Sequence, residues 1–266
     1  MAAKIAIQNL TKRFRNNSGG YTQALADINV EIADGEFFVI VGPSGCGKST
    51  LLRIMADLDT YTSGSIEIGH TDPGRPLTSM VFQEHALYPW MTVMQNAEFG
   101  LDMAGMPKEQ RRTLVRPFLE KVGLGKFENY FPHQLSGGMR QRVSLVRAFV
   151  SNPEVLLMDE PFAALDAQNK ILLQNELMRI WDENRKSVVF ITHSIDEALL
   201  LGDRIAVMTA SPGRIKEIID VPFPRPRTLF DIQGTPEYTR ISRHIWSTME
   251  AEVLNAQQLG AAHAAG

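Results

Sequence analysis

The sequence predicts an α/β fold in which helices cover a mostly parallel β-sheet. Three observations lead to this prediction. The run EFFVIV at 36–41 is continuously apolar, as in a strand buried on both faces, and leads through a glycine-rich turn into a helix pattern. The run VLLMDEP at 155–161 is a second apolar strand, and it ends in two carboxylates. From 155 onward strand and helix patterns alternate, which is typical of parallel sheets.

Composition and length set limits on the function. The chain has 266 residues, 44% hydrophobic and 21% charged, which fits one large domain or a domain with an inserted subdomain. A formal net charge of −3 argues against a nucleic-acid partner. The sequence shows neither the apolar stretch of a signal peptide nor a run as long as a membrane span. A single cysteine, Cys46, excludes an internal disulfide and fits a reducing cytosol.

The first half of the chain begins with strand patterns and then becomes helical. Alternation of apolar and polar residues predicts an edge strand near the N-terminus, and short strands follow it. Strands are expected at 4–10, 28–32, 36–41, 63–69 and 78–83. From 92 to 148 the pattern is helical, so we predict an inserted helical subdomain at about 86–150.

The second half of the chain alternates between strands and helices. Strands are expected at 155–160, 187–192, 204–210 and 214–221, and helices at 167–184 and 194–201. VPFPRPR at 221–227 has proline at every second position, so it cannot continue a helix or a central strand. We therefore predict that the main domain covers 1–227. A helix near 236–254 and a tail make up 228–266.

The glycine-rich turn matches the phosphate-loop pattern G-x-x-x-x-G-K-[ST] between a strand and a helix. Its residues, all assigned to nucleotide binding, are Gly42, Pro43, Ser44, Gly45, Cys46, Gly47, Lys48, Ser49 and Thr50. Glycines let the backbone wrap around phosphate, and the helix N-terminus adds positive potential. Lys48 supplies a point charge, and the Ser49 hydroxyl can bind Mg²⁺. Cys46 is either a small residue tolerated in the loop or a redox-sensitive thiol.

The carboxylates after 155–158 suit the chemistry of a nucleoside triphosphate. Ligands of open α/β sheets bind beyond the carboxyl ends of the strands. Asp159 is placed to hold Mg²⁺, and Glu160 to act as the base that activates a water molecule. Gln83, Asp166 and His193 also lie at or just beyond strand ends, where they could surround a γ-phosphate. Individually, each is an ordinary residue at such a position.

The stretch LSGGMRQR at 135–142 places two glycines where a helix begins. Ser136 is a good N-cap. Gly137 and Gly138 keep side chains away from the helix end, so that a phosphate can approach its amides. This stretch therefore predicts a second anion-binding element.

These motifs, in this order, resemble the nucleotide-binding subunit of ATP-binding cassette (ABC) transporters over about residues 4–220. LSGGM at 135–139 matches the signature motif of that family. The resemblance implies a P-loop NTPase with a RecA-like core, an antiparallel β subdomain and an inserted helical subdomain. It also implies that two copies of the chain clasp two ATP molecules head to tail.

The resemblance assigns roles to individual residues. Gln83 would contact Mg²⁺ and sense the γ-phosphate, and His193 would contact the γ-phosphate. Asp166 would communicate across the dimer. Ser136, Gly137 and Gly138 would bind the γ-phosphate of the ATP that is held by the partner subunit. Phe14 in LTKRF would stack on adenine, with Tyr21 as the alternative.

A narrower resemblance is to bacterial importers of the nitrate, sulfonate and taurine type. It is carried by QEHALYPWMTVMQNAEFGL at 83–101 and DRIAVMTASPGRIKEIIDVPFPRPR at 203–227. It implies an ATPase that drives uptake of a small, anionic solute through a separate permease. A periplasmic or extracellular solute-binding protein would deliver the solute to that permease. The subunit would lie peripherally on the cytoplasmic face of the inner membrane. One departure is Asp57, where the family commonly has glycine; we expect only a local effect.

The permease would dock near Glu84–Met91, a segment rich in apolar and aromatic residues. The alternative is that this segment is core of the helical subdomain. Two other functions are considered: an ABC ATPase that serves another transported substrate, and a soluble cassette that acts on DNA ends or ribosomes. The single cassette, the absence of sustained heptads and the slight acidic balance argue against the second.

Overall fold

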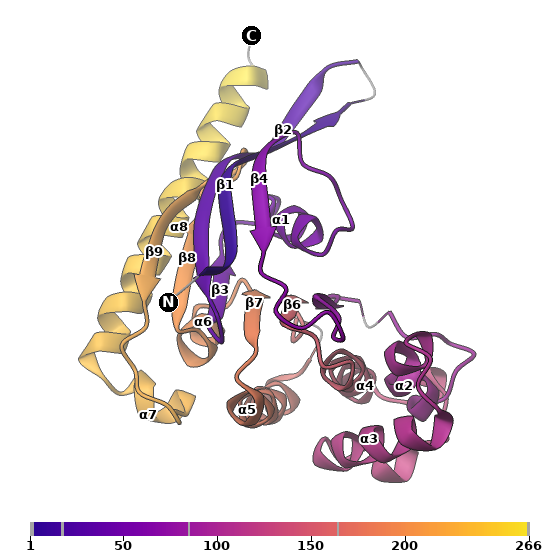
Figure 1. Ribbon diagram of the computed structural model, residues 1–266. Coiled ribbons are helices and arrows are strands. Elements are labelled where there is room, and N and C mark those ends of the chain that lie inside the picture. Colours follow the sequence, from indigo (N-terminus) through magenta and orange to yellow (C-terminus); the bar gives the residue numbers. More distant parts are fainter. Residues whose placement is uncertain (1–2, 17–18, 85, 164, 265–266) are drawn as a thin grey trace. The chain divides into compact units, whose positions relative to one another are not determined.

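The computed structural model describes residues 3–16, 19–84, 86–163 and 165–264 (Figure 1). The chain divides into two compact units. Unit 1 comprises Met1–Gly69 and Ser187–Gly266, and unit 2 comprises His70–Lys186. Across these ranges, the structure contains no helix with the length and apolar character needed to cross a membrane.

Unit 1 begins with a three-stranded antiparallel sheet, as the family resemblance implies. Its strands are β1 (Ala3–Arg15), β2 (Tyr21–Ala33) and β4 (Ser63–Ile68), in the order β2-β1-β4. β1 and β2 form a much longer hairpin than the sequence predicts. The reason is that the far end of the hairpin, from Lys12 paired with Leu25 to Arg15 paired with Tyr21, is charged and has no apolar alternation.

The second sheet of unit 1 supports the phosphate loop. Its strands are β7 (Ser187–Ile191), β3 (Phe37–Val41), β8 (Arg204–Met208) and β9 (Ile215–Asp220), in that order. The first three are parallel, and β9 is antiparallel to β8. Every residue of β3 and β7 is buried, as their continuous apolar runs predict. Helix α1 (Lys48–Met55) contacts β7, and α6 (Ile195–Leu201) contacts β3.

The C-terminal part of unit 1 consists of α7 (Leu229–Gln233) and α8 (Pro236–Ala264). α8 runs along β8 and contacts α6 and α7 (Figure 1). α8 extends beyond its predicted end at 254. α7 was not predicted, because a helix of five residues is too short to show an apolar periodicity. As the prolines at 221–227 predict, that segment contains neither helix nor strand.

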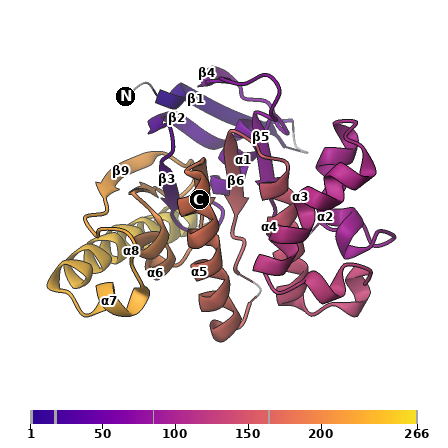
Figure 2. The same ribbon diagram turned by 60° about the horizontal axis from the view of Figure 1, so that its bottom comes forward.

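Unit 2 contains the parallel strand pair β5 (Thr78–Val81) and β6 (Val155–Asp159) together with several helices. These helices are α2 (Val93–Met103), α3 (Lys108–Lys121), α4 (Gly137–Val150) and α5 (Ala167–Asn184), with short 3-10 helices at Gly125–Phe127 and Pro132–Gln134. Figure 2 shows α2, α3 and α4 packed against one another. Thr92 and Gln95 start α2 with a reciprocal capping box.

Asp57 lies just after α1 with a backbone φ of 57°, in the left-handed region that favours glycine. This conformation explains why a glycine suits the position. We expect Asp57→Gly to raise the free energy of unfolding by about 0.5 kcal/mol, because relief of the left-handed strain exceeds glycine's entropic cost. Asp57→Ala should lower it. Urea unfolding of the three proteins measures the difference, and a loss of stability in Asp57→Gly would contradict this explanation.

Candidate functional site

The phosphate loop connects the end of β3 to the start of α1 within unit 1. Gly47 is the N-cap residue of α1, and its φ of 98° is a conformation that few residues other than glycine adopt. None of the described side chains caps this helix end, and its first turn carries no acidic residue. The first turn of α1 therefore has neither a capping side chain nor a negative charge of its own, and this helix end suits an anion.

The Lys48 side chain lies within the loop that precedes it. Its Nζ donates to the carbonyl oxygens of Gly42 at 2.8 Å and Pro43 at 2.9 Å, and it is 3.9 Å from the Cys46 sulfur. Lys48 is almost fully buried, so its charge is held at the loop rather than in solvent. This is the arrangement needed to attract the outer phosphates of a nucleotide.

The Cys46 thiol is buried at 1% exposure, and burial raises its pKa. The reactive form of cysteine is the thiolate, which a raised pKa disfavours. The structure therefore supports the interpretation of Cys46 as a small packing residue rather than a redox-sensitive thiol.

Two residues that support the phosphate loop, Leu25 and Gly213, were not identified from the sequence. A Cβ added to Gly47 would lie 2.7 Å from Leu25 Cδ2, and one added to Gly213 would lie 2.0 Å from the Cys46 carbonyl oxygen. Gly213 also exchanges backbone hydrogen bonds with Ala24 and Ala26 of β2. The loop thus rests on Leu25 and on a glycine where no side chain fits. The sequence SPG at 211–213 indicates a turn, but nothing in it indicates that Gly213 contacts the phosphate loop.

The β1–β2 register separates the two candidates for the adenine-stacking residue. Lys12 pairs with Leu25, and its Nζ lies 4.6 Å from the centroid of the Phe14 ring, so these three residues share one face of the hairpin. Leu25 packs on Gly47 of the phosphate loop, which places Phe14 on the loop side. Tyr21 pairs with Arg15, on the opposite face. Phe14 is 42% exposed and available to a ligand.

His193 lies between β7 and α6 in unit 1, and its side chain is exposed. Its neighbours are bonded to the first turn of α6. The Thr192 hydroxyl donates to the Glu197 carboxylate, and the Ser194 N–H donates to the Thr192 hydroxyl at 3.0 Å. The Ser194 hydroxyl in turn accepts from the Glu197 N–H at 3.4 Å. The backbone of His193 is therefore held on both sides.

Unit 2 brings together the other strand-end residues. β5 and β6 are parallel neighbours with Val81 opposite Met158, so Gln83 and the pair Asp159–Glu160 follow adjacent strands at the same edge. Asp159 is 6% exposed, and Gln83 is exposed. Glu160 has a φ of 44°, a strained conformation for this residue type. Strain of this kind is concentrated at functional sites, which agrees with the predicted catalytic role.

The start of α4 confirms Ser136 as an N-cap, since its hydroxyl accepts from the Met139 N–H at 3.3 Å. The positive-φ backbone positions do not include Gly137 or Gly138. A Cβ at Gly138 would meet Leu165 and Asn169 at 3.7–3.9 Å, which is ordinary contact, and one at Gly137 would come no nearer than 4.0 Å to Arg140. Neither the backbone nor the described neighbours require glycine at these two positions.

Asp166 has a local structural role. Its carboxylate caps α5, accepting from the Asn169 backbone N–H at 3.1 Å and from the Asn169 side chain at 2.7 Å. The Asn169 side chain is the main cause of the lowered pKa of Asp166, so the cap is ionised at neutral pH. The role in communication across a dimer stays a prediction.

Comparison with known proteins identifies similar chains. A family model described as ABC transporter matches residues 25–163. An uncharacterized ABC transporter ATP-binding protein of Methanocaldococcus jannaschii is 46% identical, over 96% of this chain and 95% of its own. A bicarbonate transport ATP-binding protein of Synechocystis sp. is 42% identical over 91% and 87%, and a taurine import ATP-binding protein of Roseobacter denitrificans is 40% identical over 96% and 98%.

Solved structures show the same fold. A dimeric ATP-binding cassette in a post-hydrolysis state, bound to ADP and Pi, superposes with a TM-score of 0.73 at 33% identity. The match covers 83% of this chain and 100% of the other.

Proposed function

Because this chain belongs to the ABC transporter family and carries the ATPase cassette of that family, we propose that it drives the import of a small anionic solute through a separate permease. The relatives named for bicarbonate and taurine import support this substrate class, because both molecules carry an anionic oxyacid group. A solute-binding protein would deliver the solute. The subunit would lie peripherally on the cytoplasmic face of the membrane.

The single observation that carries the proposal is the start of α4. Its two glycines have no structural reason in the described chain, and glycine destabilises a helix by up to about 1 kcal/mol relative to alanine. A phosphate approaching the amides of Gly137 and Gly138 supplies the reason. The phosphate loop is already one such site, so two elements are available to hold one ATP between two copies of the chain.

In the proposed mechanism the phosphate loop binds ATP first. The loop amides and Lys48 hold the phosphates, and the Ser136–Gly138 helix end of a second copy closes on the γ-phosphate. Glu160 then accepts a proton from the water that attacks the γ-phosphorus, and the bond from this phosphorus to the bridging oxygen breaks, which releases ADP and phosphate. His193 donates a hydrogen bond to the γ-phosphate. Lys48 and the amides stabilise the charge that develops in the transition state.

Ser49, Gln83 and Asp159 are the residues that would hold Mg²⁺. They offer a hydroxyl, an amide oxygen and a carboxylate, which are the hard oxygen donors that Mg²⁺ prefers, and Mg²⁺ keeps water in its remaining positions. When bound, the ion would neutralise phosphate charge. Phe14 would stack on adenine, because it lies on the phosphate-loop face of its hairpin while Tyr21 does not.

The segment Glu84–Met91 combines exposed and packed residues; His85 lies outside the described residues. Tyr88 is half-buried against Phe99, with ring centroids 4.6 Å apart. The Asn96 side-chain amide accepts from the Tyr88 N–H at 2.8 Å and donates to the Tyr88 carbonyl oxygen at 3.1 Å. Trp90 is 69% exposed, with its ring 5.6 Å from that of Tyr88. The segment is thus anchored to α2 while Trp90 is exposed, which supports the docking hypothesis.

A groove of about 440 Å³ in unit 2, lined by residues outside Glu84–Met91, is a further candidate for contact with the permease. Leu101, Phe118 and Phe149 contribute apolar walls, and the groove also reaches Arg75 and Lys186. Burial, with a smaller contribution from Arg75, lowers the pKa of Lys186 to about 8, so Lys186 is still mostly protonated at pH 7. The groove suits a permease segment that carries an apolar side chain and a carboxylate.

Uptake assays test the function and the docking surface together. A strain that lacks the gene should lose uptake of one labelled anion among bicarbonate, nitrate, taurine and an alkanesulfonate, and the gene should restore it. Trp90→Ser should fail to restore uptake, and the protein should leave the membrane fraction, because the exposed indole is lost from the interface. The purified Trp90→Ser protein should keep its basal ATPase activity.

Trp246→Ser is the matched control, because Trp246 is a similarly exposed tryptophan, at 63%, on α8 of unit 1. It should restore uptake fully. Unfolding of Trp90→Ser would favour the alternative that this segment is core. Normal uptake of all four anions in the deletion strain would contradict the proposed substrate class.

A further inference from the structure

We infer that the segment 225–238 acts as a clamp on α6 and thereby positions His193 for ATP hydrolysis. The clamp consists of Arg225, Arg227, Gln233 and Tyr238, which lie beyond the residues 25–163 of the family match. The inference rests on the proposed role of His193 at the γ-phosphate. All of the residues involved belong to unit 1.

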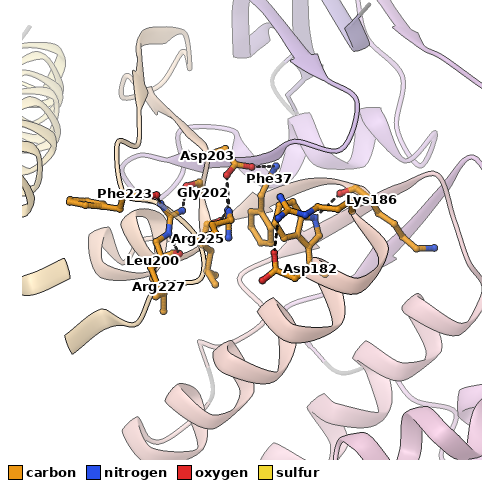
Figure 3. A network of polar contacts seen from close by, with 12 residues as sticks. Phe37, Asp182, Lys186, Leu200, Gly202, Asp203, Phe223, Arg225 and Arg227 are labelled. Carbon is orange, nitrogen blue, oxygen red and sulfur yellow. Dashed lines mark hydrogen bonds and ion pairs between the residues drawn. The ribbon is translucent and has the colours of Figure 1, made fainter. Parts of the chain in front are cut away.

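Two arginines hold the C-terminal end of α6 (Figure 3). The last carbonyl groups of a helix have no partner within it, and cations stabilise that end. Arg227 donates to the carbonyl oxygen of Leu200 at 2.7 Å and also to that of Gly202. Arg225 donates to the carbonyl oxygen of Leu201. Three successive carbonyl groups at the end of α6 are thus bonded to Arg225 and Arg227.

Arg225 also connects this end to the strand that leads into the phosphate loop. Its Nε donates to Asp203 Oδ1 at 2.9 Å, and the other oxygen of Asp203 accepts from the Phe37 N–H at 2.9 Å (Figure 3). Phe37 is the first residue of β3. The arginine is mostly buried, which strengthens its bonds to the carboxylate.

The N-terminal end of α6 is held by the start of the C-terminal helices. The Tyr238 hydroxyl donates to Asp196 Oδ1 at 2.5 Å, and Gln233 Nε2 donates to Asp196 Oδ2 at 3.4 Å. Burial and the Asp196 carboxylate raise the pKa of Tyr238 to about 12, so the hydroxyl stays a donor at neutral pH. Asp196 lies three residues after His193, in the first turn of α6.

The clamp matters to His193 because α6 is short. A helix of seven residues has few internal hydrogen bonds and depends on tertiary contacts for its stability. Its first turn is bonded to both neighbours of His193 through Glu197, Thr192 and Ser194. A displacement of α6 would therefore carry the His193 backbone with it. The clamp residues are positioning residues, since they act through α6.

Tyr238→Phe tests this inference, because it removes one hydroxyl and keeps the ring. We expect kcat for ATP hydrolysis to fall by about threefold to tenfold, which corresponds to the net loss of one ordinary hydrogen bond. The KM for ATP and the affinity for a fluorescent ATP analogue should not change, because the phosphate loop is intact. Amide hydrogen exchange of α6 should become faster. Tyr130→Phe, in unit 2, is the matched control and should change none of these values.

A double variant separates positioning from general destabilisation. In a His193→Ala background, Tyr238→Phe should cause no further loss of kcat, because its effect passes through His193. An equal further loss would overturn the inference, and so would an unchanged kcat in the single variant. Asp196→Asn provides a second single variant that weakens the same bond and should behave like Tyr238→Phe. Absence of ATPase activity in the wild-type protein would instead contradict the proposed function.

Discussion

Glu160→Gln should bind ATP with unchanged affinity, hydrolyse it about 10²–10⁴-fold more slowly, and accumulate as a closed dimer. The amide has nearly the same shape as the carboxylate but cannot accept a proton from the attacking water. Lys48 and the phosphate loop, the proposed ATP-binding elements, belong to a different part of the chain and are unchanged. Steady-state ATPase assays measure the loss, and size-exclusion chromatography with ATP detects the dimer.

The neutral substitution Glu250→Gln is the control, because Glu250 is an exposed residue of α8. It removes the same charge and should hydrolyse ATP at the wild-type rate. Normal turnover by Glu160→Gln would show that another residue activates the water. Loss of ATP binding would instead indicate that Glu160 contributes mainly to nucleotide affinity.

Mixing a Lys48→Ala subunit with a Ser136→Arg subunit should restore ATP hydrolysis that neither variant shows alone. In a head-to-tail dimer each site takes its phosphate loop from one copy and its LSGGM stretch from the other. The mixed dimer therefore keeps one complete site, formed by the intact loop of one subunit and the intact Ser136 of its partner. With random assortment, about a quarter of the wild-type activity should return.

The mixture also tests which subunit completes the site. If one copy supplied both elements to its own ATP, the mixture would stay inactive at every ratio. Ser136→Arg also removes an N-cap, which costs about 1 kcal/mol, so thermal unfolding should show that the variant is folded at the assay temperature. Titrating one variant against a fixed amount of the other should give maximal activity near equal amounts.

The sequence was sufficient for elements whose signals are local. Helix α5 occupies the predicted residues 167–184, because an aspartate N-cap and an apolar periodicity mark it. The buried strands β3, β6 and β7 were evident from uninterrupted apolar runs. The far half of the β1–β2 hairpin was not predicted, because its strands pair with each other across a charged, non-alternating stretch. That pairing is decided by register rather than by composition.

In the candidate site, too, the residues with local sequence signals were predicted and the long-range contacts were not. Motif spacing located the phosphate loop and the acidic pair, and N-cap chemistry identified Ser136. The contacts behind the loop could not be predicted, because Gly213 is more than 160 residues away in sequence from Cys46. The sequence already ranked Phe14 above Tyr21, but the structural support for that ranking comes from a strand register that includes a bulge. Contacts of this kind require the folded chain.

The backbone conformation of Glu160 has a consequence for how such subunits can change over time. A glycine at this position would relieve a strain of about 1 kcal/mol and would also abolish the proposed base. Selection for a more stable protein alone would thus favour a cassette that closes on ATP and stays closed. A chain therefore keeps glutamate at this position, despite the stability that glycine would add, only while ATP turnover is useful to the cell. A cassette with glycine here would be a durable ATP-dependent latch instead of a motor.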